Sequence, residues 1–183
     1  VEEQGGTYFL SDMKRFIEMI ISGTTWDSLG VRGLRSEVAI RATNPRESNS
    51  GFLLYGLCSI LFNNNQMISS DDINTVLPQL KAMHQKMGYQ ENSTGILFDN
   101  YLNQGIGAYP VIAGYESQVI EFYKQNEEIQ DRLMNQISIF IPEPTIWSNH
   151  TFIAISDAGE KLMHALMDEK IQEIAWESYG FRT

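Results

Sequence analysis

Residues 43–52 read TNPRESNSGF and lie between a short apolar run, EVAIRA, and a long one, LLYGLCSILF. The Asn-Pro pair favours a turn, and Ser-Asn-Ser-Gly is typical of the start of a helix. We therefore predict a short strand over residues 37–43 and a helix from about Asn49 to Phe62. A strand that turns directly into a helix is the repeating unit of α/β proteins, so this stretch decides the fold class.

The same alternation continues along the chain. Apolar residues at helical spacing predict further helices over residues 11–22, 70–87, 92–104, 116–126 and 157–179, the last divided near Asp168. Runs rich in Val, Ile and Phe predict strands over residues 108–115, 136–144 and 151–156. Ser11 and Ser70 are the expected N-caps of their helices. The order predicts an α/β fold with a mainly parallel sheet flanked by helices.

The overall composition is that of a globular protein. The chain has 183 residues, of which 43% are hydrophobic and 20% charged, so it fits one large domain or two small lobes. Its net charge of -10 argues against binding to nucleic acid or to anionic membranes, although a small anion can still be held by local N–H donors. The single cysteine, Cys58, lies in an apolar stretch and is expected to be buried, and a disulfide scaffold is excluded.

The corner at residues 43–52 is also the first candidate site. The first turn of a helix has free N–H groups, which together with the helix dipole can bind an anion or a carbonyl group. Serine hydroxyls add uncharged donors, and glycine lets a ligand approach the backbone. The candidate ligand-binding residues here are Thr43, Ser48, Asn49, Ser50 and Gly51. The alternative is that Ser48 or Asn49 only caps the helix.

A second candidate corner follows the predicted strand at 108–115, where the sequence reads YPVIAGYESQ. Tyr115 and Glu116 would bring an aromatic hydroxyl and a carboxylate to the start of a helix. Since both corners follow strands, we expect them at the same edge of a parallel sheet, facing one cleft. The alternative is that Glu116 only favours the start of its helix.

Four motifs occur in an order that resembles a known family: IRATNPRESNSGF (40–52), GAYPVIAGYES (107–117), PEPTIWSNHTFIAIS (142–156) and EKIQEIAWESYGFRT (169–183). Together they resemble the C-terminal two-thirds of bacterial extracellular solute-binding proteins of the type 2 periplasmic-binding fold. The branch that captures molybdate, sulfate and related anions for ABC importers is the most similar. The resemblance extends over nearly the whole chain.

This resemblance implies two α/β lobes that close on a ligand at a hinge. Residues 1–117 would form the second lobe, and residues 118–183 would return to the first. Residues 48–51 resemble the ligand donors of the second lobe, Tyr115 resembles the tyrosine that reaches the ligand, and residues 147–150 would cross between the lobes. The family's opening strand and serine-bearing loop have no counterpart, so we expect a C-terminal fragment with an incomplete first lobe.

The expected function is therefore that of a non-catalytic protein that delivers a small solute, such as an oxyanion, to a membrane ABC permease. The family implies an extracellular or periplasmic location and, for the full-length protein, a lipoprotein anchor. We expect no cofactor, no metal, no catalytic residue and no nucleic-acid partner, since the three histidines show no metal spacing. Exposed apolar surface on the fragment would favour a homodimer or an exchanged dimer.

Two other functions stay open. The same fold could serve as a ligand-sensing domain of a cytoplasmic regulatory or signalling protein. A hydrolase is less favoured, because Ser148 and His150 occur without a GxSxG elbow. The ligand itself is also open: serine and backbone donors favour molybdate, tungstate or sulfate, whereas Glu116 beside Tyr115 favours a cationic or sugar-like solute.

Overall fold

The computed structural model describes residues 1–182, apart from the side chains of residues 132–134. The chain divides into two compact units. Unit 1 consists of Val1–Gly114 and Phe140–Ile146, and unit 2 consists of Tyr115–Ile139 and the described residues from Trp147 onward.

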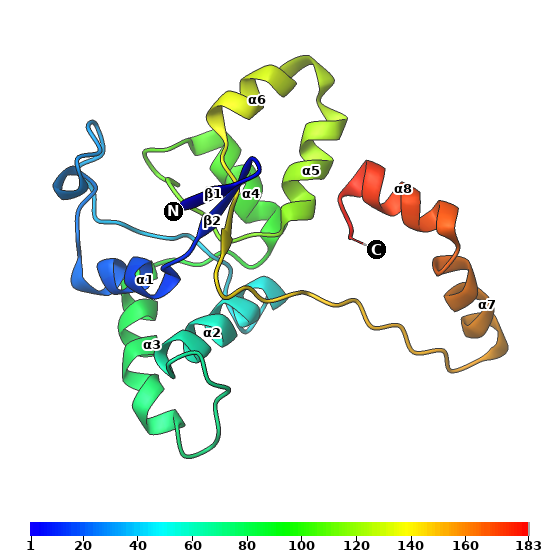
Figure 1. Ribbon diagram of the computed structural model, residues 1–183, viewed down its shortest axis with the longest axis horizontal. Coiled ribbons are helices and arrows are strands. Elements are labelled where there is room, and N and C mark those ends of the chain that lie inside the picture. The colour runs from blue at the N-terminus through cyan, green and yellow to red at the C-terminus, as the bar shows by residue number, and fades with distance from the viewer. Residues whose placement is uncertain (183) are drawn as a thin grey trace. The chain divides into compact units, whose positions relative to one another are not determined.

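Unit 1 contains a small sheet and four α-helices, labelled in Figure 1. Its elements are β1 (Glu2–Gln4), β2 (Thr7–Leu10), α1 (Met13–Ser22), α2 (Asn49–Phe62), α3 (Ile73–Met87), α4 (Thr94–Gln104) and β3 (Phe140–Pro142). Unit 2 consists of α5 (Glu116–Gln125), α6 (Gln130–Gln136), α7 (Asp157–Leu166) and α8 (Glu169–Tyr179). Short 3₁₀ turns cover Asp27–Leu29 and Glu127–Ile129. Helices and strands thus share the chain, which is broadly α/β as predicted.

The three-stranded sheet is mixed, so a mainly parallel sheet is the wrong description of it. β1 and β2 form an antiparallel hairpin that the sequence pattern did not predict, and β2 runs parallel to β3. Tyr8 lies opposite Phe140 in this second pair. Because β3 completes this sheet, Phe140–Pro142 belongs to unit 1 together with the first part of the chain.

Residues 37–43, which we call the central segment, form a second and less regular set of backbone pairings. The central segment pairs in parallel with Ile112 through Arg41 and with Glu91 through Thr43. Backbone N–H groups of Arg41 and Ala113 donate to the carbonyls of Val111 and Arg41 at 2.9 and 2.8 Å. Residues 37–43 and 108–115 are therefore parallel neighbours as predicted, although single bridges join them in place of regular strands. Residues 151–156 form no strand, so that prediction is wrong.

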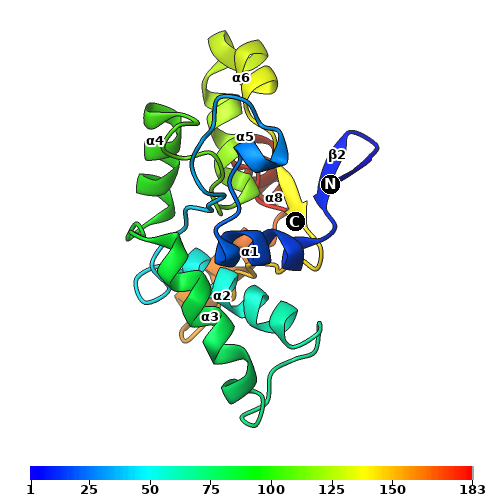
Figure 2. The same cartoon turned by 90° about the vertical axis from the view of Figure 1, so that its left-hand side faces the viewer.

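The core of unit 1 lies where α1, α2 and α3 pack against one another (Figures 1 and 2). Helix α1 contributes one apolar face, whereas α2 is apolar nearly all round and is buried on several sides. The buried apolar side chains in these helices and in the central segment include Met13, Ile17, Ile20, Val38, Ile40, Ala42, Leu54, Leu57, Leu61, Val76, Met83 and Met87. Cys58 is fully buried as predicted, and burial raises the pKa of its thiol to about 12.

Two of the residues that we predicted as helix N-caps are corrected by the structure. Asp12 caps α1 in place of the expected Ser11, and its carboxylate accepts a hydrogen bond from the Arg15 N–H at 3.0 Å. Asp72, in place of Ser70, precedes the first residue of α3. The carboxylate of Asp72 accepts hydrogen bonds from Ser69, which lower its pKa.

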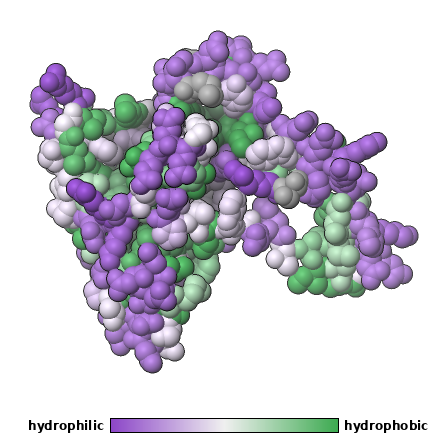
Figure 3. Space-filling model, viewed as in Figure 1, coloured by the Kyte–Doolittle hydropathy of each residue, from purple (hydrophilic) through white to green (hydrophobic). Residues whose placement is uncertain are grey.

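Unit 2 has little interior of its own. Helices α5, α7 and α8 have no buried residue within the described part of the chain, although α5 and α8 pack together. Ile153, Ile155 and Met167 are 76%, 93% and 72% exposed. Figure 3 shows this apolar surface over α7 and the segment that leads into it. Among the described residues, no helix combines the length and the apolar character needed to cross a membrane.

Candidate functional site

Three hydroxyl groups meet where the central segment ends and α2 begins. The hydroxyl groups of Thr43 and Ser50 share a hydrogen bond of 2.7 Å, and those of Ser48 and Ser50 share one of 3.3 Å. Thr43 is fully buried and Ser50 is 9% exposed. We call Thr43, Ser48, Ser50 and Gly51 the serine corner. It lies at the carboxyl end of a buried parallel segment, which is where α/β proteins commonly bind ligands.

Ser48 occupies the N-cap position of α2 without acting as a side-chain cap. Its backbone is extended, and within the described residues its hydroxyl makes no cap hydrogen bond to the helix. The hydroxyl instead lies within hydrogen-bonding distance of Ser50. A capping role for Ser48 therefore does not explain the serine corner. Asn49, the first residue of α2, is exposed.

Gly51 brings α2 into direct contact with the end of the central segment. A Cβ atom at this position would lie 2.2 Å from the Thr43 carbonyl oxygen and 2.9 Å from both the Asn44 carbonyl carbon and the Pro45 nitrogen. The glycine is therefore required for packing between helix and segment. The expectation that Gly51 also lets a ligand approach the backbone stays a prediction.

A carboxylate that the sequence pattern did not identify lies beside the serine corner. Glu91 pairs with Thr43 across the parallel bridge, and it is 8% exposed. Its Oε1 atom accepts hydrogen bonds from Asn100 Nδ2 at 2.8 Å and from the Tyr109 hydroxyl at 3.2 Å. Asn100 belongs to α4 and Tyr109 to the segment before Ile112. Three stretches of unit 1 therefore meet at one buried carboxylate.

Arg41 supplies the positive charge nearest to this group along the central segment. One guanidinium nitrogen of Arg41 donates to the Met87 carbonyl at 2.9 Å, and the guanidinium carbon lies 6.0 Å from the centre of the Tyr109 ring. Burial of the Tyr109 hydroxyl and its hydrogen bond to Glu91 raise the pKa of Tyr109, against the opposing effect of Arg41. Arg41 thus contacts Tyr109 and forms no ion pair with Glu91 among the described residues.

The second predicted corner belongs to unit 2. Tyr115 occupies the N-cap position of α5, and its backbone N–H donates to Gln118 Oε1 at 3.3 Å. Glu116 accepts two hydrogen bonds of 2.9 Å from the Arg182 guanidinium, which raise the pKa of Arg182. The Arg182 guanidinium also lies 5.6 Å from the ring centres of both Trp147 and Trp176.

Glu116 therefore has a structural partner at the C-terminal end of the chain. The guanidinium and carboxylate meet through two parallel hydrogen bonds, a geometry that favours a stable pair. The Arg182 guanidinium would therefore compete with a ligand for the carboxylate of Glu116. Because the serine corner belongs to unit 1 and Tyr115 to unit 2, the convergence of the two corners on one cleft stays a prediction.

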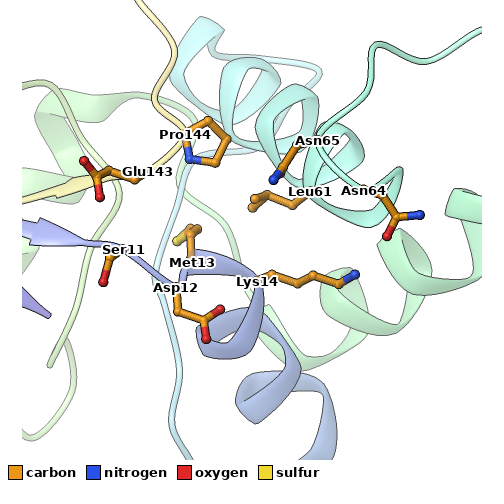
Figure 4. A pocket seen from close by; sticks show the side chains of 9 residues that line it. All are labelled: Ser11, Asp12, Met13, Lys14, Leu61, Asn64, Asn65, Glu143 and Pro144. Atoms are coloured by element: carbon orange, nitrogen blue, oxygen red, sulfur yellow. The ribbon is translucent and has the colours of Figure 1, made fainter.

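A cavity of about 310 Å³ in unit 1 lies apart from the predicted residues (Figure 4). It is lined by Ser11, Asp12, Met13, Lys14, Leu61, Asn64, Asn65, Glu143 and Pro144. In Figure 4, Asn65 points into the hollow between Pro144 and Leu61, and Lys14 extends beneath Leu61. Asn64 and Asn65 have left-handed φ angles of 53° and 62°. The mixed charges of this lining suit a small polar molecule.

A second cavity of about 270 Å³ lies between α2 and α3, with Leu77, Leu80 and the stem of Lys81 in its lining. At its edge the Tyr55 hydroxyl is hydrogen-bonded to His84 Nδ1 and accepts from Gln90 Nε2 at 2.9 Å. Burial raises the pKa of Tyr55. Neither cavity had a signal in the sequence, because each combines residues that tertiary packing brings together.

Within the described residues, no group of three or more His, Cys, Asp and Glu side chains could hold a metal ion. His150, which together with Ser148 suggested a hydrolase, packs edge-on against Phe181 with the ring centres 5.4 Å apart. The family resemblance rests on the four sequence motifs alone: no known protein family, curated protein or solved structure matches the chain.

Proposed function

We propose that the protein is a non-catalytic solute-binding protein whose ligand contacts the serine corner. The observation that carries the proposal is the chain of hydrogen-bonded hydroxyl groups that runs from the buried Thr43 and Ser50 to the half-buried Ser48 at the start of α2. Buried polar groups cost free energy unless they are hydrogen-bonded, and three hydroxyls together can donate to and accept from a small solute. The helix dipole favours a negatively charged group of the solute at this point.

The proposal also includes the family suggested by the four motifs. We propose a type 2 periplasmic-binding fold, in which the second lobe carries the serine corner and a membrane ABC permease receives the solute outside the cytoplasm. The parallel pairing of Arg41 with Ile112 and of Thr43 with Glu91 supports this assignment, because ligand sites of α/β proteins lie at the carboxyl ends of parallel strands. The exposed apolar residues of α7 and α8 support a partner surface for these helices, such as a second copy of the chain.

Ser50→Ala is expected to weaken solute binding about tenfold, because a lost hydrogen bond to a charged ligand costs roughly 1.5–3 kcal/mol. Tyr115→Phe is expected to have a similar effect if both corners face the ligand. The measurement is calorimetric titration of the protein with molybdate, sulfate, phosphate and a set of neutral, cationic and zwitterionic solutes.

Ser59→Ala is the matched control for this experiment. Ser59 is a second largely buried serine of α2, and its hydroxyl donates to the Tyr55 carbonyl at 2.7 Å, away from the serine corner. Its replacement is expected to leave affinity unchanged. If Ser50→Ala and Tyr115→Phe both bind solute as tightly as the unmodified protein, the ligand site lies elsewhere.

A further inference from the structure

The second cavity, which we call the α2–α3 groove, has an apolar floor and a polar rim. It lies between two helices that pack against each other (Figures 1 and 2). It is lined by Tyr55, Leu77, Leu80, Lys81, His84 and Gln85. Tyr55 and Leu80 also pack on the core of unit 1, whereas Leu77 is 38% exposed. The core therefore fixes the floor of the groove, and the floor is open to solvent.

The rim carries positive charge in a chain whose net charge is -10. Neither α2 nor α3 contains Asp or Glu, and Lys81 forms no ion pair within the described residues. Asp72, the nearest acidic residue before Lys81, is about 14 Å away along the helix, beyond the ~8 Å over which exposed charges act in physiological salt. Glu91, the nearest after it, accepts from Asn100 and Tyr109 instead. The rim therefore favours an anionic group.

His84 is held at the rim with one ring nitrogen left for a ligand. The Tyr55 hydroxyl accepts a hydrogen bond from Gln90 Nε2 at 2.9 Å and is hydrogen-bonded to His84 Nδ1. The hydroxyl proton has two acceptors within reach, Nδ1 and the Met87 sulfur at 4.0 Å, and the ring nitrogen is the stronger acceptor. With Nδ1 accepting, the ring proton lies on Nε2. Nε2 makes no hydrogen bond among the described residues, so it can donate to a ligand.

We propose that the α2–α3 groove binds a small apolar carboxylate. The hydrocarbon or phenyl body of the ligand lies on Leu77, Leu80 and the Tyr55 ring. Its carboxylate accepts hydrogen bonds from the Lys81 ammonium group and from His84 Nε2, and such charge-assisted bonds are stronger than neutral ones. A neutral molecule of the same shape gains the apolar contacts alone, and a cation is repelled by Lys81.

The size of the groove points to a free acid. Cavities that hold drug-sized ligands span about 300–1,000 Å³, so a groove of about 270 Å³ suits a molecule of about ten non-hydrogen atoms. Phenylacetate and octanoate have this size. The inference is independent of the proposed function, because the groove and the serine corner are formed by different residues of unit 1.

Nuclear magnetic resonance titration of the isotope-labelled protein with phenylacetate and octanoate tests the inference. Phenylacetamide and phenethylamine keep the phenyl body and replace the anion by a neutral and a cationic group. Phenylacetate is expected to bind with a Kd of about 1 mM or tighter, about fivefold more tightly than phenylacetamide and about tenfold more tightly than phenethylamine. The largest shifts are expected at the backbone amides of Leu77, Lys81 and His84.

Lys81→Met removes the charge and keeps an apolar stem. It is expected to weaken phenylacetate binding about fivefold and phenylacetamide binding less than about twofold. Lys86→Met is the matched control: it removes the same charge from the same helix, but Lys86 is paired with Glu37 at 2.9 Å. Its affinity for phenylacetate is expected to change less than about twofold. Leu77→Glu places a carboxylate on the floor of the groove and is expected to abolish binding of both acids.

Three results would each overturn the inference: no saturable binding of either acid up to about 10 mM, equal affinity for phenylacetate and phenylacetamide, or equal affinity of Lys81→Met and Lys86→Met for phenylacetate. Largest shifts away from Lys81 and His84 would do so too. None of these results decides the proposed function, which is tested at Ser50 and Tyr115 with a different set of solutes.

Discussion

Gly51→Ala is expected to lower the free energy of unfolding by about 3 kcal/mol, the upper end of the range for overpacking a closely packed position. The new methyl group would lie 2.2 Å from the Thr43 carbonyl oxygen, and this neighbour is backbone, which cannot turn aside as a flexible side chain can. Helix α2 would have to move away from the central segment, and the contact between Thr43 and Ser50 would be lost. In a chain of this size the change corresponds to a fall of about 6–12 °C in melting temperature.

Thermal unfolding followed by circular dichroism measures this effect, and Gly56→Ala provides the matched control. Gly56 lies in the same helix, and no described atom lies within 4 Å of the position of its added Cβ. Because alanine is the better helix former, Gly56→Ala is expected to stabilise the protein by up to about 1 kcal/mol. Equal melting temperatures for the two variants would contradict the close packing of α2 on Thr43.

Gly180→Ala is expected to lower the free energy of local opening of α8, which packs on α5, by about 3 kcal/mol. Two costs add at this position. Gly180 has a left-handed φ angle of 70°, which costs alanine about 1–2 kcal/mol. The added Cβ would also lie 2.7 Å from Ile120 Cβ and 3.0 Å from Ser117 Cα. The following turn, which leads to Arg182 and its pair with Glu116, depends on this close approach.

Hydrogen–deuterium exchange of the α8 amides measures the loosening, and a loss of 3 kcal/mol corresponds to about a hundredfold faster exchange. Gly30→Ala is the control for the backbone cost alone. Gly30 also has a left-handed φ angle, 83°, but no described atom lies within 4 Å of the position of its Cβ. This variant is expected to leave exchange in α8 unchanged. Unaltered exchange in Gly180→Ala would show that the contact with Ile120 contributes little.

The elements predicted well from the sequence are those with strong local signals at both ends. Helix α2 follows Asn-Pro, begins within Ser-Asn-Ser-Gly and ends at a run of asparagines, and its observed bounds, Asn49–Phe62, are the predicted ones. The break between α7 and α8 at Asp168 and the end at Gly180 follow in the same way, because Asp168 caps α8 and Gly180 terminates it. Capping and turn chemistry act within a few residues, so a single sequence contains them.

The strands were predicted less well because a strand depends on its neighbours. Residues 151–156 have the composition of a buried strand, but within the described residues they have no strand partner. In contrast, β1 and β2 pair although Glu2–Gln4 is polar and exposed, with Gly5 and Gly6 as the only local signal. The pairing of Thr43 with Glu91 is also tertiary, since residues 89–91 show neither apolar alternation nor β-branched side chains.

The same distinction applies to the site. The serine corner could be predicted because a strand end, a turn and a helix start follow one another in the chain. Glu91 could not, because its neighbours Asn100 and Tyr109 come from separate stretches that only the folded chain brings together. The pairing of Glu116 with Arg182 likewise joins residues far apart in sequence.

Nuclear magnetic resonance titration of the isotope-labelled protein tests most directly whether the solute binds at the serine corner. On addition of the best-binding solute, the largest shifts are expected at the backbone amides of Ser50, Gly51 and Glu91. The principal alternative is the polar cavity at the start of α1. Largest shifts at Lys14 and Asn65, with the amides of the serine corner unmoved, would contradict binding at the serine corner.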